Sequence, residues 1–232
     1  MKKMLFFLAL APLIGSAFAQ GSKSRTEDER LGQAATVMRE ILGMPEGIPQ
    51  NLLDRATCVL VYPGVKKGAF VFGGSYGRGA ITCRTGRNFS GPWSAPAMFA
   101  LEGFSFGLQA GGQATDFVLL VMNEGGAQSV MSSKVKLGAD ASIAAGPVGR
   151  AASAETDVVM RAQILSYSRS RGIFAGLSLA GSTMRSDGGA NRNLYGKDLS
   201  ATQIVREGAV KPTKSGRELI AVLTKASPNR KS

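Results

Sequence analysis

The chain has 232 residues, and its 28 lysines and arginines against 16 aspartates and glutamates give a formal net charge of +12. This length is enough for one domain with a sizeable core, and the basic balance favours anionic partners such as phospholipid headgroups, nucleic acid or acidic glycans. The chain contains no histidine. This excludes Ser-His-Asp catalysis, and with two cysteines it argues against a structural zinc site.

The first 19 residues have the pattern of an export signal. Lys2 and Lys3 precede the apolar run 4–14, and residues 17–19 (Ala-Phe-Ala) have the A-x-A form of a cleavage site. The run is too short for a membrane-spanning helix. Residues 1–19 are therefore predicted to be a signal peptide, so the protein is expected to be exported, either periplasmic or secreted, and soluble or peripheral on a membrane. Export makes nucleic acid an unexpected partner.

A polar leader, 20–25, precedes a predicted amphipathic helix over 26–42. Thr26 and Glu29 have the spacing of a capping box, and Gly43 begins the stop signal. The apolar residues of this helix recur at helical spacing: Leu31, Ala34, Ala35, Met38, Ile41 and Leu42. Two interpretations remain open at this point. The helix docks on the domain's own core, or it inserts Leu31, Met38 and Leu42 into a membrane interface.

The two cysteines fall in a region where the sequence predicts three strands, 58–62, 69–75 and 80–84, with a turn at Pro63-Gly64. In a flat meander Cys58 and Cys83 would lie about 9.6 Å apart, two strand spacings, whereas a disulfide needs Cα atoms within about 7 Å. Either the two cysteine strands are direct neighbours and a disulfide forms, or both thiols are simply buried.

The remaining segments predict a single domain over 26–226. Its fold class is α+β, with a strongly curved, mainly antiparallel sheet or barrel-like core flanked by N- and C-terminal helices. The further expected elements are helices at 48–56, 126–132, 200–207 and 213–226, strands at 103–111, 117–122, 134–137, 139–145, 157–167 and 173–184, a polar loop at 187–196 and a basic, frayed tail at 227–232. Ser215 and Glu218 have capping-box spacing in the last helix.

Catalytic motifs are weak in this chain. Residues 73–77 match G-x-S-x-G around Ser75, but this motif needs a histidine base and a strand-to-helix turn. Ser133 opens an S-x-x-K match without the companion motifs. A set of carboxylates lacks the spacing of a calcium loop: Asp116, Glu124, Asp140, Glu155 and Asp157. We predict no enzyme activity, metal or cofactor, and a serine hydrolase is only a third hypothesis.

Long stretches of the chain resemble the SYLF domain family. They are ATCVLVYPGVKKGAFVFGGSYGRGAITCRT at 56–85, GPWSAPAMFALEGFSFGLQAGGQATDFVLLVMN at 91–123, the glycine-rich stretch 138–181 and NLYG at 193–196. The family includes eukaryotic proteins that bind phosphoinositides and, in some members, actin filaments. It also includes exported bacterial proteins described as lipid-binding, and eukaryotic members use an N-terminal amphipathic helix at the membrane. The resemblance implies an anionic-lipid-binding module, without the eukaryotic ligands.

Basic side chains in or near predicted turns are the candidate lipid-binding residues, at roughly 1 kcal/mol each near an anionic leaflet. They are Lys66, Lys67, Arg78, Arg84, Arg169 and Arg171. The predicted function is non-enzymatic binding of anionic phospholipid or a membrane surface at the cell envelope. The alternative is an envelope protein that holds a protein partner. An uncovered apolar face on the first helix favours lipid, and a docked helix favours the protein partner. The sequence does not indicate an oligomeric state.

Overall fold

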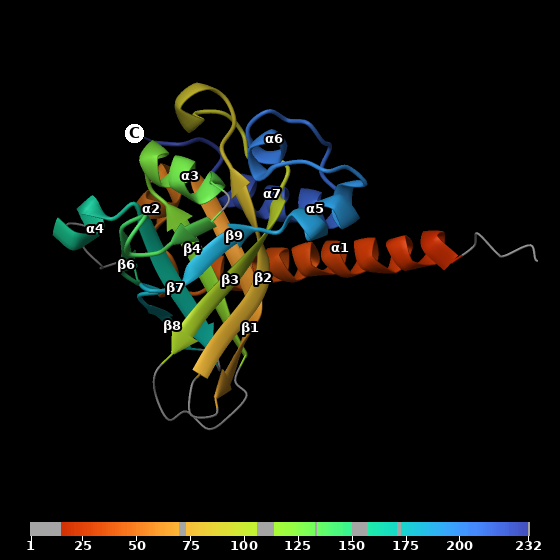
Figure 1. The fold of residues 1–232 in the computed structure, drawn as a ribbon. Coiled ribbons are helices and arrows are strands. Elements are labelled where there is room, and N and C mark those ends of the chain that lie inside the picture. Colours follow the sequence, from red (N-terminus) through yellow and green to blue (C-terminus); the bar gives the residue numbers. More distant parts are fainter. Residues whose placement is uncertain are drawn as a thin grey trace, which may run out of the picture.

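A curved β-sheet forms the centre of the computed structural model (Figure 1), which describes residues 15–69, 73–105, 114–132, 134–149, 157–170 and 173–231. The strands are β1 (Cys58–Ala69), β2 (Gly73–Cys83), β3 (Ala97–Ser105), β4 (Ala114–Val121), β5 (Lys134–Lys136), β6 (Ile143–Ala145), β7 (Ile164–Ser170), β8 (Ile173–Gly176) and β9 (Thr183–Ser186). Their order is β5-β9-β3-β2-β1-β4-β7-β6, and β8 pairs with β7. Only the β6–β7 pair among these strands is parallel. The predicted class, α+β with a strongly curved, mainly antiparallel sheet, is confirmed.

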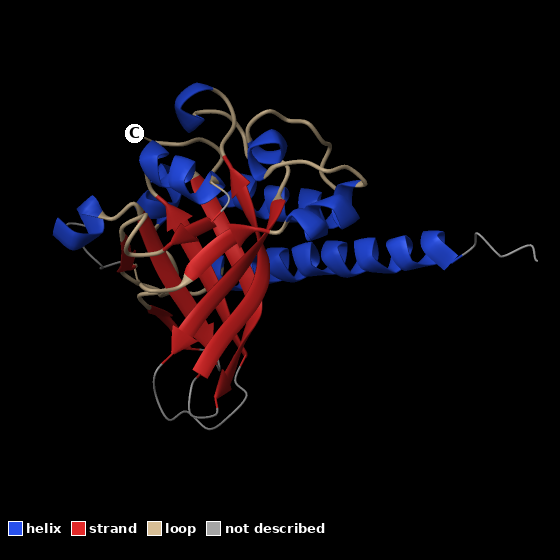
Figure 2. Cartoon of the chain, in the orientation of Figure 1, coloured by secondary structure: helices blue, strands red, loops and turns tan. Residues whose placement is uncertain are grey.

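The helices cover the sides and one end of the sheet (Figure 2). They are α1 (Gly15–Leu42), α2 (Gln50–Arg55), α3 (Glu124–Met131), α4 (Asp157–Arg161), α5 (Gly188–Tyr195), α6 (Ala201–Val205) and α7 (Lys214–Ala226), with a short 3-10 turn at Arg87–Phe89. At the opposite end, where β1 ends and β2 begins, none of the described helices covers the strands (Figure 2).

Strand β1 shows why both faces of the sheet are covered. Its apolar residues alternate between two clusters, so a continuous apolar run marks a strand that is buried on both sides. Cys58, Leu60 and Tyr62 face the cluster that includes residues of α3 and α6. Val59 and Val61 face the cluster formed with α1, α2 and α7. The two helix layers therefore sit on opposite faces of one sheet.

The first helix is longer than predicted. It runs without interruption from Gly15 to Leu42, so Thr26 does not begin it and residues 20–25 are helical. The proposed cleavage after residue 19 would shorten this helix and leave the segment that contacts the domain intact.

The region 58–84 contains two strands instead of three. Pro63-Gly64 does not turn the chain. β1 continues through an irregularity in its pairing with both neighbours, where Gly64 adopts a φ of +58°. β2 likewise runs through 76–79 as one strand. At Gly79 a Cβ atom would lie 2.0 Å from the carbonyl oxygen of Val61, so a glycine is required where the two backbones approach. The glycines in 76–79 were predicted to form a turn, but in the structure they allow neighbouring strands to pack closely.

Several other boundaries differ from the predictions. Residues 157–161 form helix α4 before strand β7 begins, 139–142 lie outside strand β6, and 173–184 is divided into β8 and β9. The predicted loop 187–196 contains helix α5, which Asp187 caps by accepting a hydrogen bond from the Ala190 amide. Helix α7 is capped by Thr213 and not by Ser215. The part of the glycine-rich strand 103–111 beyond Ser105 lies outside the described residues.

Candidate ligand-binding surfaces

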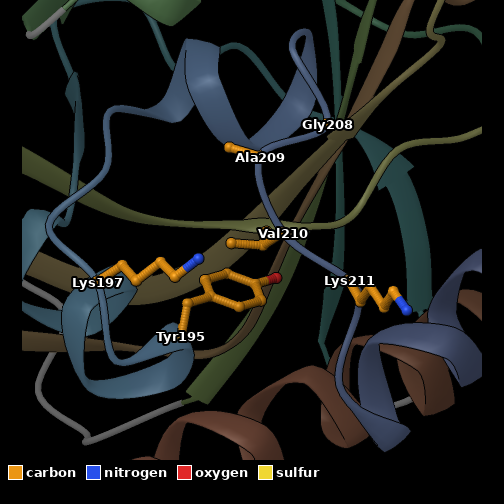
Figure 3. A pocket seen from close by; sticks show the side chains of 6 residues that line it. All are labelled: Tyr195, Lys197, Gly208, Ala209, Val210 and Lys211. Carbon is orange, nitrogen blue, oxygen red and sulfur yellow. The ribbon is translucent and has the colours of Figure 1, made fainter.

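A pocket of about 420 Å³ lies between the end of α5 and the segment that leads into α7 (Figure 3). It is lined by Tyr195, Lys197, Gly208, Ala209, Val210 and Lys211. Another pocket of similar volume lies beside β5 and β9 and is lined by Lys134, Lys136, Asp140, Gly181 and Thr183. None of the residues predicted from the sequence to bind lipid lines either of these pockets.

The apolar face of α1 is docked on the domain. Leu31 and Met38 are fully buried, and Leu42 is partly buried against the cluster shared with α2 and α7. Of the two interpretations of this helix, the structure therefore shows docking on the core. These side chains are not available to a membrane while α1 is in this position.

Arg78 joins the sheet to two helices. Its Nη2 lies 2.9 Å from Glu27 Oε1 on α1, and its Nε lies 2.8 Å from Asp187 Oδ2 at the start of α5. Burial alone would lower the pKa of Arg78, but its hydrogen bond to Asp187 and the charges of Asp187 and Glu27 raise it overall. The guanidinium therefore stays charged and paired. It contacts the protein's own carboxylates instead of presenting a free charge to lipid.

Arg169 has the equivalent position at the other end of the docked segment of α1. Its Nη2 lies 2.7 Å from Asp116 Oδ2 on β4, and its Nη1 pairs with Glu40 near the end of α1. Burial lowers the pKa of Arg169, but the hydrogen bonds to Glu40 and Asp116 outweigh it and raise the pKa overall. We call Arg78 and Arg169 the clasp arginines, because each ties α1 to a strand. Arg171 lies outside the described residues.

Removing a clasp is expected to loosen α1. For Arg169→Gln we expect the free energy of unfolding to fall by about 1–2 kcal/mol, because the partly buried Asp116 loses its charged donor. We also expect faster amide exchange along residues 31–42. The matched control is Arg185→Gln, whose pair with Glu102 is 40% and 41% exposed and should contribute about 0.5 kcal/mol. Equal losses in urea unfolding for the two variants would argue against the clasp.

Arg84 has a structural position, although the sequence placed it at a basic surface. It is fully buried, and its guanidinium carbon lies 4.0 Å from the ring centre of Trp93. Its Nη2 donates to the Ser227 carbonyl oxygen at 2.7 Å, and its Nη1 donates to the Pro228 carbonyl oxygen at 2.9 Å. Burial lowers the pKa of Arg84, while the charge of Asp54 raises it. Arg84 therefore holds the C-terminal segment in place.

The C-terminal segment 227–231 is docked, so the predicted frayed tail is not observed. Ser227 is fully buried. The Lys231 amide donates to the Asp54 carbonyl oxygen at 2.9 Å, and Lys231 Nζ lies 2.7 Å from Asp54 Oδ2. Burial alone would raise the pKa of Asp54, but hydrogen bonds from Lys231, Gln50 and Ser227 lower it overall.

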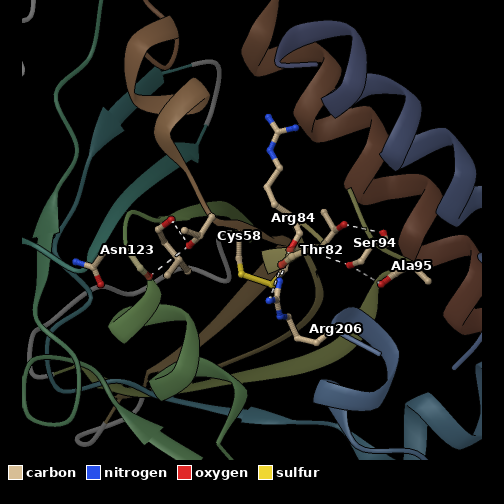
Figure 4. Close-up of a disulfide and its surroundings, with 11 residues drawn as sticks. Cys58, Thr82, Arg84, Ser94, Ala95, Asn123 and Arg206 are labelled. Atoms are coloured by element: carbon tan, nitrogen blue, oxygen red, sulfur yellow. Dashed lines mark hydrogen bonds between the residues drawn. A yellow bond between two sulfur atoms is a disulfide. The ribbon is translucent and has the colours of Figure 1, made fainter. Parts of the chain in front are cut away.

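The cysteines form a disulfide between directly neighbouring strands. Cys58 on β1 and Cys83 on β2 are paired in register, and their Cα atoms are 3.9 Å apart. Both are fully buried. Figure 4 shows Arg84 and Arg206 on opposite sides of the strand end that carries the disulfide. Of the two alternatives left open by the sequence, the structure contains the bonded one, because the region holds two strands and not three.

The described residues do not form a catalytic site around the weak motif matches noted in the sequence. Ser75 lies inside strand β2, and its hydroxyl donates to the Gly103 carbonyl oxygen at 3.4 Å, so no strand-to-helix turn exposes it. Ser133 falls outside the described residues. In the part of the chain that the structure describes, no three of the cysteines, aspartates and glutamates gather as a metal site. No helix there combines the length and apolar character needed to cross a bilayer.

An exposed group of side chains lies at the helix-free end of the sheet. Lys66 on β1 is exposed, pairs in register with Tyr76 on β2, and forms no ion pair with another described residue. Residues paired in antiparallel strands point to the same face, so Lys66 and Tyr76 are neighbours. Tyr76 is 48% exposed. Ile173, at the start of β8, is 71% exposed, but β4 and β7 separate β8 from β1. We call Lys66 and Tyr76 the strand-end surface.

Only Lys66 of this surface was predicted from the sequence as a binding residue. Tyr76 lies in the segment that was predicted to join the strands 69–75 and 80–84. A tyrosine on one strand and a lysine on the next strand are recognised as neighbours only when the register of the two strands is known. Lys67 pairs in register with Ser75, but its side chain is not described.

Comparison with known proteins gives one family and several relatives. Residues 102–226 match the Ysc84 family, described as "Las17-binding protein actin regulator". Protein YSC84 of Saccharomyces cerevisiae is 33% identical over 221 residues, which are 90% of this chain and 45% of the relative. An SH3 domain-containing protein of Schizosaccharomyces pombe is 34% identical over 197 residues, 82% of this chain and 45% of the relative. An SH3 domain-containing YSC84-like protein of Xenopus laevis is 30% identical over 201 residues, 82% of this chain and 58% of the relative. The chain thus spans about half the length of these relatives.

Proposed function

This chain belongs to the Ysc84 family, the SYLF domain family, and we propose that it is a non-enzymatic binding protein whose ligand is an anionic membrane surface. The family description names a protein-binding regulator, which supports binding over catalysis. The observation that carries the proposal is the strand-end surface, where the unpaired Lys66 lies beside the half-exposed Tyr76. Lys66 lies three residues before the end of β1 and Tyr76 three residues after the start of β2, and none of the described helices covers this end of the two strands (Figure 2).

The chemistry of the strand-end surface suits a lipid headgroup region. Tyrosine has an apolar ring and a polar tip, and such residues are enriched at membrane interfaces. Lys66 contributes about 1 kcal/mol near an anionic leaflet, and burial of the Tyr76 ring in the interface adds to it. The sum supports reversible association and not permanent anchoring. The lysine contribution is electrostatic, so salt weakens binding.

We further propose that the protein acts at the cell envelope. The support is the signal-peptide pattern at 1–19, with its basic start, apolar run and A-x-A site.

A protein partner is the second candidate function. The observation in its favour is the docked α1, because a helix whose apolar face is covered cannot serve as a membrane anchor in that position. The family description, which includes Las17 binding, points the same way. The two candidates differ in what they require: only the membrane hypothesis needs binding to vesicles that contain no protein.

Vesicle sedimentation tests the membrane hypothesis. The mature protein is expected to bind phosphatidylglycerol vesicles at low salt and to lose this binding as salt increases. The double variant Lys66→Glu, Tyr76→Ala should bind at least tenfold more weakly, because it reverses one charge and removes one interfacial ring. The matched control is Lys225→Glu on α7, which makes the same charge change at another exposed site and should weaken binding less than threefold.

Two results would count against the strand-end surface. One is equal binding to neutral and anionic vesicles, independent of salt. The other is an equal loss in the double variant and the Lys225→Glu control. If wild-type protein binds neither kind of vesicle, the protein-partner function is favoured.

A further inference from the structure

The pocket between α5 and α7 has a rigid, neutral floor. Tyr195 is the last residue of α5, and its hydroxyl donates to the carbonyl oxygen of Pro96. Burial, and then the charge of Asp28, raise the pKa of Tyr195, so its hydroxyl stays protonated. On one side Gly196, with a φ of +69°, ends the helix and directs the chain to Lys197. On the other side Gly208, with a φ of +67°, begins the stretch that carries Ala209 and Val210.

Two uncompensated positive charges flank this floor. Lys197 and Lys211 are both exposed, and neither forms an ion pair with another residue in the described part of the chain. Figure 3 shows them on opposite sides of the Tyr195 ring, with the amino group of Lys197 turned toward the pocket and that of Lys211 turned away from the ring. Asp198, the next residue after Lys197, is already paired with Arg192. No carboxylate lines the pocket.

The pocket beside β5 and β9 has a similar volume and also two lysines, but it carries its own counter-charge. Asp140 lines it, and the Asp140 carboxylate accepts a hydrogen bond from the Lys136 amide at 2.7 Å. The lysines there have an anion within the protein. No carboxylate lines the pocket between α5 and α7, although the charge of Asp28 reaches Tyr195 from outside the lining. An anionic ligand would therefore supply the counter-charge that the lining residues lack.

We propose that the pocket formed by Tyr195, Lys197, Val210 and Lys211 binds a phosphate group. Lysine ammonium groups act as compact point charges and suit phosphate, whereas planar bidentate recognition of a carboxylate favours arginine, and no arginine lines this pocket. The volume of about 420 Å³ is in the range of small-ligand sites. Val210 and Ala209 offer an apolar wall for the remainder of the ligand. The phosphate belongs either to a free phosphorylated molecule or to a lipid headgroup.

The test is a titration of ¹⁵N-labelled mature protein with pyrophosphate at constant ionic strength, followed by NMR. Saturable shifts are expected at the amides of residues 195–197 and 208–211. The variant Lys197→Glu, Lys211→Glu should weaken pyrophosphate binding at least tenfold. The matched control is Lys134→Glu, Lys136→Glu, which changes the net charge equally at the other pocket and should leave binding within threefold of wild type. Thermal unfolding of both variants checks that each is folded.

Each outcome of this titration has a defined reading. Site-specific loss in the pocket variant supports the phosphate site. If that variant also binds phosphatidylglycerol vesicles more weakly than the wild type, the phosphate belongs to a lipid headgroup. If its binding to vesicles is unchanged, the ligand is a free phosphorylated molecule. Shifts that do not saturate, or an equal loss in both double variants, would overturn the proposal, whatever the result at the strand-end surface.

Discussion

Replacing Arg84 with alanine is expected to lower the free energy of unfolding by about 3 kcal/mol or more. The substitution removes a fully buried guanidinium that stacks on Trp93 and donates to Ser227 and Pro228. Both carbonyl oxygens would lose a charged donor, and a hydrogen bond to a charged group contributes about 1.5–3 kcal/mol. Among the described residues, only Trp93 Nε1 would still donate to the Ser227 oxygen. A cavity beside Trp93 adds to this cost.

Urea unfolding measures the change, with two variants for comparison. Arg84→Lys keeps the charge but loses the planar fork and the stacking, so it should recover only part of the stability. Arg206→Ala is the matched control. Arg206 stacks on Phe89 at 3.8 Å and donates to the backbone oxygens of Arg84 and Gly86, but it is only partly buried. Equal losses for Arg84→Ala and Arg206→Ala would contradict the structural role given to Arg84.

Loss of the disulfide is expected to have an effect of similar size. Cys58 and Cys83 are separated by 25 residues, and closing a loop of that length restricts the unfolded chain by about 3.5 kcal/mol. The double variant Cys58→Ala, Cys83→Ala should therefore unfold at a clearly lower urea concentration than the wild type. The native pairing of β1 and β2 remains, so the variant should still fold.

A reducing agent provides the control for the disulfide prediction. Reduced wild-type protein should approach the stability of the double variant, and the double variant itself should not respond to the reducing agent. If thiol titration shows complete reduction and the stability of the wild type is unchanged, the disulfide does not stabilise the fold.

The elements that depend on local pattern could be predicted. The apolar spacing of Leu31 and Met38 indicated the first helix, and the apolar run that starts at Cys58 indicated a strand buried on both faces. The helix predicted at 200–207 contains α6, which Ser200 caps through a complete capping box with Gln203 that was not predicted. Each of these signals is formed by residues that lie a few positions apart, so it can be recognised in a single sequence.

The roles of the arginines depend on distant partners and could not be predicted. Arg78 bonds to Glu27, 51 residues away, and Arg84 bonds to Ser227, 143 residues away. An arginine in a glycine-rich stretch has the same local appearance whether it faces water or a buried carbonyl group. The basic residues therefore suggested a lipid-binding surface, while in the structure three of them hold helices and the C-terminal segment in place.

Helix α5 was missed for a related reason. Its sequence, Gly-Gly-Ala-Asn-Arg-Asn-Leu-Tyr, is polar and opens with two glycines, which are poor helix formers. Its stability comes from the Asp187 cap, from Asn191, whose side-chain oxygen accepts from the Met98 amide, and from Ala190 and Leu194 packed against Leu31. Tertiary contacts override a weak local preference.

The docked C-terminal segment has a kinetic consequence. Helices α1 and α7 pack on each other, and residues 227–231 contact Arg84 and Asp54, so the first and last parts of the chain meet in the finished fold. Contacts with such large sequence separation make folding slow, because a long loop must close before they form. During synthesis, the acceptor Ser227 is made 143 residues after Arg84. We therefore expect the nascent chain to stay incompletely folded until residues 227–231 have left the ribosome, which keeps the earlier part of the chain open to chaperones until then.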